Sequence, residues 1–351
     1  MAKKKNITFN DIAKYTNFSK TTISRYFNNP DSLTLENQKI ISDALIALDY
    51  KENKVARILA NGKTEFIGII VPNIYLNYYS EMLSQILLTY EEYGYKFLVF
   101  AGNENEEIER QYIQELLAYK IEGMIILSHT IPSHELASYQ VPIVTIERED
   151  KYVCSVNTDN YMGATQAASL LARHHCDVLI HINSKVPENW PDYQRIKGFQ
   201  DFCMDHGIRN DIIYTELGTS FDICSKNLTS VFERLEEKYD GQKKGIFISG
   251  DTYANLFLNL IVRKYGFLPE DYFIIGFDNS PISREAIIPI STIGQQIDKL
   301  AHEAVSLLVE LMNERKKRRP ALFTQPVHRV VTPVLFRRET TEKNDRPEVQ
   351  P

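Results

Sequence analysis

Cysteine is scarce in this chain of 351 residues, which has only four: Cys154, Cys176, Cys203 and Cys224. No pair shows the CxxC spacing typical of zinc or thiol redox sites, so we expect neither a metal nor a disulfide framework. Long hydrophobic runs are missing as well. There is no 18-residue apolar stretch to cross a membrane and no apolar signal segment at the amino end. We therefore expect a cytoplasmic protein, not a membrane protein or an exported binding protein.

Common enzyme motifs are also absent. The sequence has no GxGxxG or Walker loop for a nucleotide and no GxSxG nucleophile elbow. No general acid and base pair has motif support. We therefore expect no catalytic residues and no cofactor.

Charge is distributed unevenly along the chain. Residues 1–63 contain 11 Lys or Arg and 6 Asp or Glu, a net charge of +5, whereas the whole chain carries −6. The remainder is therefore at −11. Such an asymmetry favours binding of the cationic amino-terminal piece to phosphates and keeps the rest away from a nucleic acid.

The segment 7–27 has the pattern of a helix-turn-helix. Ile12 and Ala13 occupy inward positions on the first helix, and Ser19 is suited to cap a second helix. A third helix is predicted after Thr34, and it carries one apolar stripe made of Ile40, Ile41, Ala44, Leu45 and Leu48. Three such helices can enclose one small core, as in a DNA-binding headpiece.

The rest of the chain, from about residue 65 to 338, alternates short apolar runs with amphipathic stretches. The runs are Phe66–Val71, Phe97–Phe100, Met124–Leu127, Ile143–Ile146, Val178–Ile182, Ile246–Ile248 and Phe273–Gly276. Helical patterns lie between them, near 79–93, 105–120, 160–175, 192–206, 221–239, 252–265 and 297–314. This alternation favours parallel sheets covered by helices. The length exceeds what one hydrophobic core usually holds, which predicts two lobes.

Three stretches carry a resemblance to a known family. The headpiece ITFNDIAKYTNFSKTTISRYFNN, the following LDYKENKVARILANGKT and the apolar FIGIIVPN resemble the lactose-repressor (LacI/GalR) family of bacterial transcription regulators. The similarity extends to Val334–Arg338. It implies a helical helix-turn-helix headpiece and a two-lobed α/β core with parallel sheets, like that of periplasmic binding proteins. The chain would cross three times between the lobes and hold a ligand in the cleft.

The resemblance also implies roles on the second helix. Lys20, Thr21 and Arg25 would read bases in the major groove, where arginine favours a bidentate contact to guanine. Short polar side chains nearby would contact phosphates and set the register on the duplex. These phosphate-contact candidates are Thr8, Ser19, Thr22, Ser24 and Asn28.

The segment Asn53–Ala60, NKVARILA, resembles the hinge helix of the family. A helix of eight residues is marginal in water, so we expect it to form only when two copies pack on DNA. Val55, Ala56 and Leu59 would then face the partner and the minor groove, with Leu59 as the wedge between base pairs.

Candidate effector-binding residues are predicted at strand ends, because ligands of such sheets bind beyond the carboxyl ends of the strands. Arg195 matches the arginine that in this family holds effector hydroxyl or acid groups. Three aspartates, Asp159, Asp251 and Asp278, could instead cap the helix that follows each of them. At position 250 this chain has glycine, whereas many members of the family have asparagine there. The candidates are Tyr75, Tyr79, Arg148, Asp159, Arg195, Phe221, Asp251, Asp278 and Gln295.

The sequence thus divides into a headpiece (1–52), a hinge and linker (53–64), an effector-binding and dimerisation core (65–338) and a flexible polar tail (339–351). We predict a homodimeric repressor of carbohydrate-utilisation genes that binds a palindromic operator and responds to a sugar or sugar phosphate. Two alternatives stay open: a purine or phosphoprotein corepressor on the same scaffold, and an enzyme with an appended DNA-binding unit.

Overall fold

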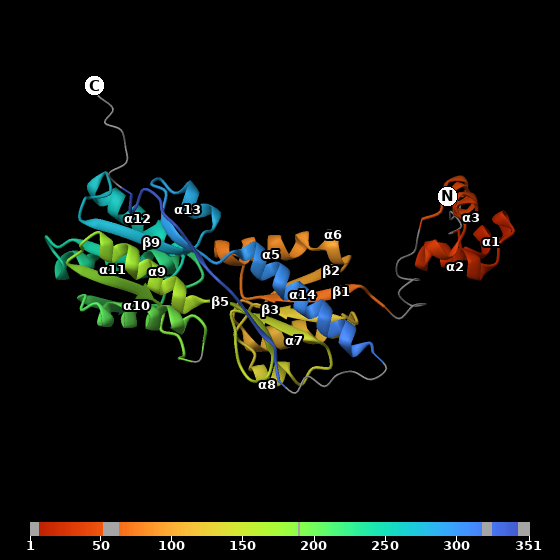
Figure 1. The fold of residues 1–351 in the computed structure, drawn as a ribbon, viewed down its shortest axis with the longest axis horizontal. Coiled ribbons are helices and arrows are strands. Elements are labelled where there is room, and N and C mark those ends of the chain that lie inside the picture. Colours follow the sequence, from red (N-terminus) through yellow and green to blue (C-terminus); the bar gives the residue numbers. More distant parts are fainter. Residues whose placement is uncertain (1–6, 52–62, 189, 318–324, 343–351) are drawn as a thin grey trace, which may run out of the picture. The chain divides into compact units, whose positions relative to one another are not determined.

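The computed structural model describes residues 7–51, 63–188, 190–317 and 325–342. The chain forms two compact units, residues 1–63 and 64–351 (Figure 1). The hinge helix predicted at 53–60, with Val55, Ala56 and Leu59, lies outside the described residues.

The smaller unit is a three-helix headpiece. It consists of α1 (Phe9–Thr16), α2 (Lys20–Asn28), a short 3-10 turn η1 (Pro30–Ser32) and α3 (Leu35–Ala47). Its core buries Ile12, Ala13, Ile23 and Ile41, with a ring of aromatic side chains packed around them. The apolar stripe predicted on α3 is wrong at Ile40, which is 40% exposed because its neighbour Ile41 takes the inward position.

The larger unit contains two sheets of six strands, each with helices on both faces, and the chain folds into two lobes around them (Figure 1). In the first lobe the strand order is β11-β5-β4-β3-β1-β2, and every pairing is parallel. Its strands are β1 (Phe66–Val71), β2 (Lys96–Ala101), β3 (Gly123–Ile126), β4 (Ile143–Ile146), β5 (Cys154–Thr158) and β11 (His328–Val331). Its helices are α5 (Asn77–Leu88), α6 (Tyr90–Tyr93), α7 (Glu106–Ala118), α8 (Ser133–Leu136) and α14 (Ile297–Arg315).

The second lobe repeats this plan with the order β12-β10-β9-β8-β6-β7. Only β12 is antiparallel to its neighbour, β10. The strands are β6 (Val178–Asn183), β7 (Asn210–Tyr214), β8 (Lys244–Ile248), β9 (Tyr272–Asp278), β10 (Ser291–Gly294) and β12 (Val334–Phe336). The helices are α9 (Asn160–Arg173), α10 (Tyr193–Asp205), α11 (Phe221–Lys238), α12 (Asp251–Tyr265) and α13 (Pro281–Glu285).

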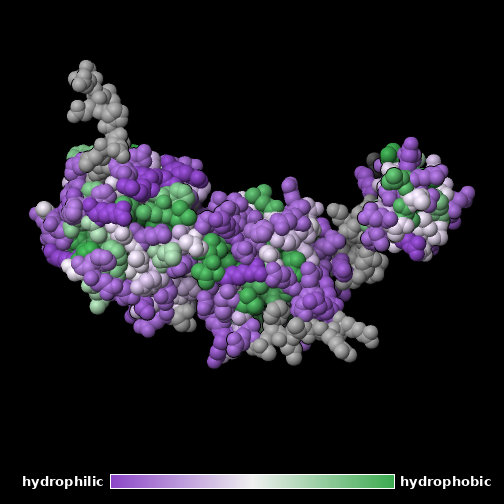
Figure 2. Space-filling view, viewed as in Figure 1, coloured by the Kyte–Doolittle hydropathy of each residue, from purple (hydrophilic) through white to green (hydrophobic). Residues whose placement is uncertain are grey.

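The chain passes between the lobes three times: from β5 to α9, from β10 to α14, and from β11 to β12. This confirms the predicted fold class and the three crossings. The predicted apolar runs are strands because parallel strands covered on both faces bury nearly every side chain. Hydrophilic side chains cover most of the visible face of this unit (Figure 2). No helix in the described part of the chain is long and apolar enough to span a membrane.

The predicted boundary of the flexible tail needs a correction. Thr340 and Thr341 are buried. The hydroxyl of Thr340 donates to the carbonyl of Ile274 at 2.7 Å and accepts from the backbone N–H of Ser291 at 2.9 Å. Residues 339–342 therefore belong to the second lobe, because their polar side chains satisfy buried backbone groups of β9 and β10.

The histidine on β6 gives the fold a pH dependence. His181 is fully buried and stacks on Phe247 with ring centroids 4.4 Å apart. Its Nδ1 lies 3.0 Å from the carbonyl oxygen of Phe247, and burial lowers the pKa of the ring to about 3. The neutral ring is therefore favoured in the folded state. Its contribution to the free energy of unfolding is present above pH 6.5 and is lost as the pH falls toward 3.

We expect His181→Phe to reduce the acid sensitivity of the protein. Between pH 7 and pH 5 the free energy of unfolding should fall by about 2 kcal/mol less than in the wild type, because no ring has to be kept neutral. Urea unfolding at the two pH values measures this. The matched control is His206→Phe, at an exposed position on the same lobe. Equal pH slopes for wild type and His181→Phe would contradict the prediction.

Candidate functional site

The headpiece presents one polar face along α2. Ile23 is buried, whereas Lys20, Thr21 and Arg25 are exposed. Helical periodicity places residues 21 and 25 one above the other, so their side chains leave the helix in nearly the same direction. The three residues predicted to read bases are therefore all accessible, and Thr21 and Arg25 share one face of α2.

The residues predicted to contact phosphates have structural partners in the headpiece. The backbone N–H and the hydroxyl of Thr8 both donate to the carboxylate of Asp11, at 2.9 and 2.7 Å. Ser19 caps α2, since its hydroxyl oxygen accepts from the backbone N–H of Thr22 at 3.1 Å. Asn28 donates its side-chain amide to Ser24 at 3.1 Å. These bonds shape both ends of α2 and the start of α1, and the phosphate role stays a prediction.

A cavity of about 320 Å³ lies between the lobes of the larger unit. This is near the lower limit of ligand pockets, which measure about 300–1,000 Å³. Its lining comes from the carboxyl ends of the parallel strands of both sheets and from the loops that follow them. The polar and aromatic lining residues are Tyr78, Tyr79, Glu104, His129, Glu147, Asn183, Ser184, Trp190, Asp192, Arg195, Glu216, Thr219, Ser249, Thr252, Tyr253, Asp278 and Gln295.

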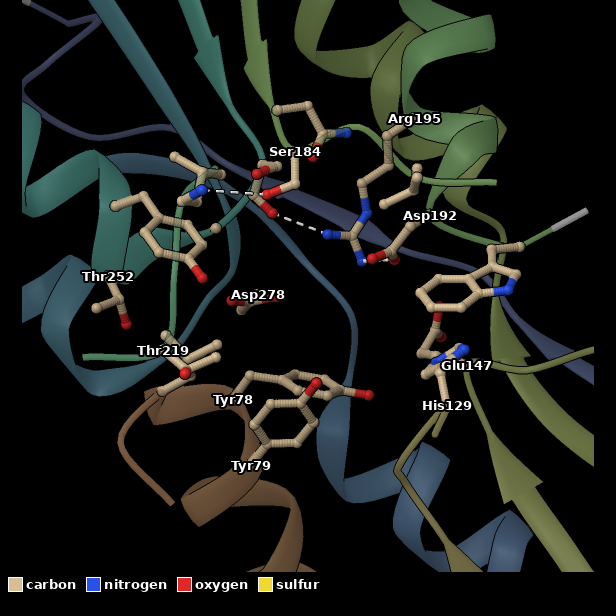
Figure 3. Close-up of a pocket in the computed structure, with 18 of the residues that line it drawn as sticks. Tyr78, Tyr79, His129, Glu147, Ser184, Asp192, Arg195, Thr219, Thr252 and Asp278 are labelled. Atoms are coloured by element: carbon tan, nitrogen blue, oxygen red, sulfur yellow. Dashed lines mark hydrogen bonds and ion pairs between the residues drawn. The ribbon is translucent and has the colours of Figure 1, made fainter. Parts of the chain in front are cut away.

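Arg195, in the first turn of α10, is the central cation of the cavity wall. Its Nε donates to the Asn160 side-chain oxygen at 2.7 Å, and its Nη1 donates to the Ser249 carbonyl at 2.8 Å. Nη2 lies 3.2 Å from a carboxylate oxygen of Asp192, and the guanidinium sits 3.8 Å above the ring centre of Phe277. Figure 3 shows Arg195 and Asp192 on one side of the cavity and Tyr78 and Tyr79 on the other.

The charges around Arg195 are strongly coupled. Burial opposes the charge of Arg195, but Asp192, Asp278 and Glu147 outweigh it and raise the pKa of the guanidinium. Burial raises the pKa of Glu147, although Arg195 partly offsets this effect. Burial and the charge of Asp251 raise the pKa of Asp278 well above its usual value. The wall thus keeps its guanidinium charged and disfavours charge on its most buried carboxyl groups.

Aromatic rings form the rest of the wall. Trp190 of the second lobe and His129 of the first lie against one another, with ring centroids 4.2 Å apart. The hydroxyl of Tyr78 and Nδ1 of His129 are buried and have no hydrogen-bond partner among the described residues. Burial lowers the pKa of His129 to about 4, so the ring is neutral at neutral pH. Two polar atoms therefore remain free to bond a ligand.

Four of the nine predicted effector residues line the cavity: Tyr79, Arg195, Asp278 and Gln295. Gln295 lies where the chain leaves β10, and its side-chain amide donates to Asp278 at 2.5 Å. Its side-chain oxygen accepts from the hydroxyl of Thr158 at 2.7 Å. These residues come together because several strands of both lobes end at this one place.

The placement of Arg148 and Asp159 in the cavity is wrong. The guanidinium of Arg148 turns to the other side of the strand end and donates to the backbone carbonyls of Ser128 and Ile131. Asp159 caps α9, where its carboxylate accepts from the backbone N–H of Met162 at 2.9 Å. Both side chains stabilise backbone beside the cavity and do not line it.

The other three candidates also lie outside the lining. Burial and the nearby Cys224 thiol of the second lobe raise the pKa of Tyr75 to about 12. Phe221 is 53% exposed at the start of α11. Asp251 is fully buried beneath the cavity, where its carboxylate accepts from the Thr292 hydroxyl and the Ser280 backbone N–H.

The sequence analysis missed several residues of the wall. Glu147 is the immediate neighbour of Arg148 and follows the end of β4 with a left-handed backbone (φ 55°), so the strand pattern does not indicate which of the two side chains faces the cavity. Asp192 lies three residues before Arg195, a spacing that predicts an ion pair on one helix turn. Trp190 is the single tryptophan of the chain and follows β6, which was a usable signal.

A helical headpiece and a two-lobed α/β core with a polar interlobe cavity define a ligand-binding regulator with the fold of periplasmic binding proteins. Comparisons with known proteins agree with this class. Residues 64–222 match the family described as periplasmic binding proteins and sugar binding domain of LacI family, and residues 167–333 match a periplasmic binding protein-like domain.

Relatives and solved structures extend the match to the headpiece. The sucrose operon repressor of Streptococcus mutans is 29% identical over 306 residues, which cover 87% of this chain and 92% of the relative. The ribose operon repressor of Bacillus subtilis is 27% identical over 96% of this chain and 99% of the relative. A lac repressor dimer, solved with operator and an anti-inducer, has the same fold, with a TM-score of 0.77 at 18% identity, over 96% of this chain and 99% of that chain. The chain belongs to the LacI/GalR family of transcription regulators.

Proposed function

We propose that this protein is a sequence-specific repressor of carbohydrate-utilisation genes whose operator affinity changes when a sugar or sugar phosphate occupies the interlobe cavity. The observation that carries the proposal is the cavity itself. It combines aromatic faces, unpartnered polar atoms and the Arg195 network, a set of groups suited to a hydroxylated ring. Relatives named as sucrose and ribose operon repressors support it.

The headpiece supplies the DNA-binding part of the proposal. Two chains would place their α2 helices in successive major grooves of a palindrome, with half-sites about one duplex turn apart. Lys20, Thr21 and Arg25 would read bases, and the hinge segment 53–60 would enter the minor groove. This role places the protein in the cytoplasm with the chromosome. Exposed apolar side chains on α5 and α6, Leu87, Leu88 and Tyr90, support a homodimer.

The lobes supply the regulatory part. Asn77 of the first lobe donates its side-chain amide to the hydroxyl of Thr252 of the second at 3.4 Å. The Trp190 and His129 pair is a second contact across the same gap. A ligand that bonds both walls binds better to one arrangement of the lobes and therefore changes the population of the arrangement that holds operator DNA. Coupling of this kind is typically about 1–3 kcal/mol.

Selection of palindromic fragments from random DNA, followed by fluorescence anisotropy, tests the proposal. We expect the selected site to bind at least about 1,000-fold more tightly than scrambled DNA at physiological salt. One sugar or sugar phosphate of a panel should change this affinity by about 5- to 150-fold. Equal affinity for selected and scrambled DNA, with and without every compound, would contradict the proposed function.

A further inference from the structure

The cavity lining has more carboxyl groups than cationic groups. Among the lining residues that the structure describes, five carry carboxyl groups and one, Arg195, carries a guanidinium. Two of the carboxylates, Glu104 and Glu216, are exposed at the mouth of the cavity and have no side-chain hydrogen bond or ion pair in the described structure. The five acidic residues are Glu104, Glu147, Asp192, Glu216 and Asp278.

The one guanidinium is already bonded within the protein. Three of its N–H groups point to Asn160, the Ser249 carbonyl and Asp192, and its face lies on Phe277. The Asp192 pair compensates its charge directly. An incoming anion would therefore compete with a carboxylate for the same cation.

No second cation is available in the described lining. His129 is the only other basic side chain there, and burial keeps its ring neutral near pH 7. Lysine does not occur among the lining residues. A phosphate group usually binds where arginine, lysine or several backbone N–H groups of a helix start converge. Here the starts of α5, α10 and α12 line the cavity, but lysine and a free guanidinium are missing from the described lining, and the exposed carboxylates of Glu104 and Glu216 oppose an anion.

The groups that are free suit hydroxyls. The Tyr78 hydroxyl and Nδ1 of His129 are buried without partners, and the second carboxyl oxygen of Asp278 accepts no hydrogen bond from the described residues, since Gln295 bonds the first. Neutral donors and carboxyl acceptors of this kind bond alcohol groups, while the Trp190 and Tyr79 rings offer faces to the apolar side of a sugar ring.

We propose that the effector is a hydroxyl-rich compound with no anionic group, and that the cavity rejects the phosphorylated form of the same sugar. This inference rests on the proposed function and narrows it. The exposed carboxylates of Glu104 and Glu216 repel a phosphate, and the compensated guanidinium offers it no free positive charge, whereas a neutral sugar meets only hydrogen-bonding groups and ring faces.

Matched pairs of compounds test the inference on the full-length protein. Trp190 is the only tryptophan and lies in the cavity wall, so its fluorescence reports binding there. Titrations would use sucrose and sucrose 6-phosphate, fructose and fructose 6-phosphate, and ribose and ribose 5-phosphate, with calorimetry as a second readout. We expect at least one neutral sugar to bind and its phosphate to bind at least tenfold more weakly. A phosphate that binds as tightly as its neutral partner, or more tightly, would overturn the inference.

A charge variant tests whether electrostatic repulsion, and not the shape of the cavity, causes the weaker binding of phosphorylated sugars. The double variant E104Q/E216Q removes the two unpaired carboxylates and keeps side-chain size, so the ratio of neutral to phosphorylated affinity should fall several-fold. The control E233Q/E237Q removes two exposed carboxylates from α11 and should leave the ratio unchanged. An unchanged ratio in E104Q/E216Q would contradict the electrostatic cause. Binding of neither member of any pair, in a protein that still selects its palindrome, would instead contradict the sugar effector of the proposed function.

Discussion

Replacing Arg195 with alanine is expected to shift the response to effector to much higher effector concentrations while operator binding persists. The variant removes the guanidinium that organises Asn160, Asp192 and the Ser249 carbonyl on the cavity wall. Hydrogen bonds that involve a charged group contribute about 1.5–3 kcal/mol, so effector affinity should fall by roughly 10- to 150-fold. Operator binding should survive because the headpiece has its own core. Anisotropy on operator DNA, with and without effector, measures both properties.

The same substitution should also destabilise the second lobe. Arg195 is 7% exposed, and its loss leaves a carboxylate and a backbone carbonyl without their partner. Breaking a fully buried pair typically costs about 3–5 kcal/mol, and the cost here should be smaller because the side chain of Asp192 is 42% exposed and water screens the pair. Arg148→Ala is the control for stability. Arg148 is equally buried at 9% exposure, but it bonds backbone carbonyls of the first lobe and does not line the cavity. A comparable loss of effector response in Arg148→Ala would show that our assignment of Arg195 is wrong.

The parallel sheets were largely predictable because their strands are continuous apolar runs. Five strands were not found: β5, β7, β10, β11 and β12. Two of them, β5 and β10, have buried polar side chains that are hydrogen-bonded to distant residues. In β5, Ser155 bonds Nδ1 of His328 at 2.8 Å. In β10, Thr292 donates to Asp251 at 2.6 Å. A search for hydrophobic runs misses such strands, because burial here is compensated by hydrogen bonds between residues far apart in the sequence.

The cavity was less predictable than the fold for a related reason. Sequence position indicates that a residue follows a strand, but the direction of its side chain depends on the backbone conformation of the turn, which at Glu147 is left-handed (φ 55°). Glu147 faces the cavity and Arg148 faces away. The charge balance of the wall depends on this difference, since a prediction that includes Arg148 gives a cavity with two arginines. The structure leaves one compensated guanidinium, and the inferred ligand narrows from a sugar or sugar phosphate to a neutral compound.

Arg25→Ala is expected to remove much of the preference for operator over random DNA. Arg25 is exposed on α2, one turn after Thr21. A bidentate arginine contact to guanine contributes about 1–3 kcal/mol of discrimination, so operator affinity should fall by roughly 5- to 150-fold. Binding to random DNA should weaken much less and stay salt-sensitive, because contacts to phosphates do not depend on sequence. Anisotropy titrations on both DNAs at several salt concentrations measure the ratio.

Lys39→Ala is the matched control for the loss of one positive charge. Lys39 is exposed on α3 of the same headpiece, outside α2. If α2 reads the bases, the two variants should weaken binding to random DNA to a similar extent, and only Arg25→Ala should lower the ratio of operator to random affinity. Selection of DNA by Arg25→Ala should also relax at one base pair in each half-site, because one side chain contacts one guanine. An equal fall of the ratio in both variants would mean that the headpiece acts only through its net charge and that α2 does not read the operator.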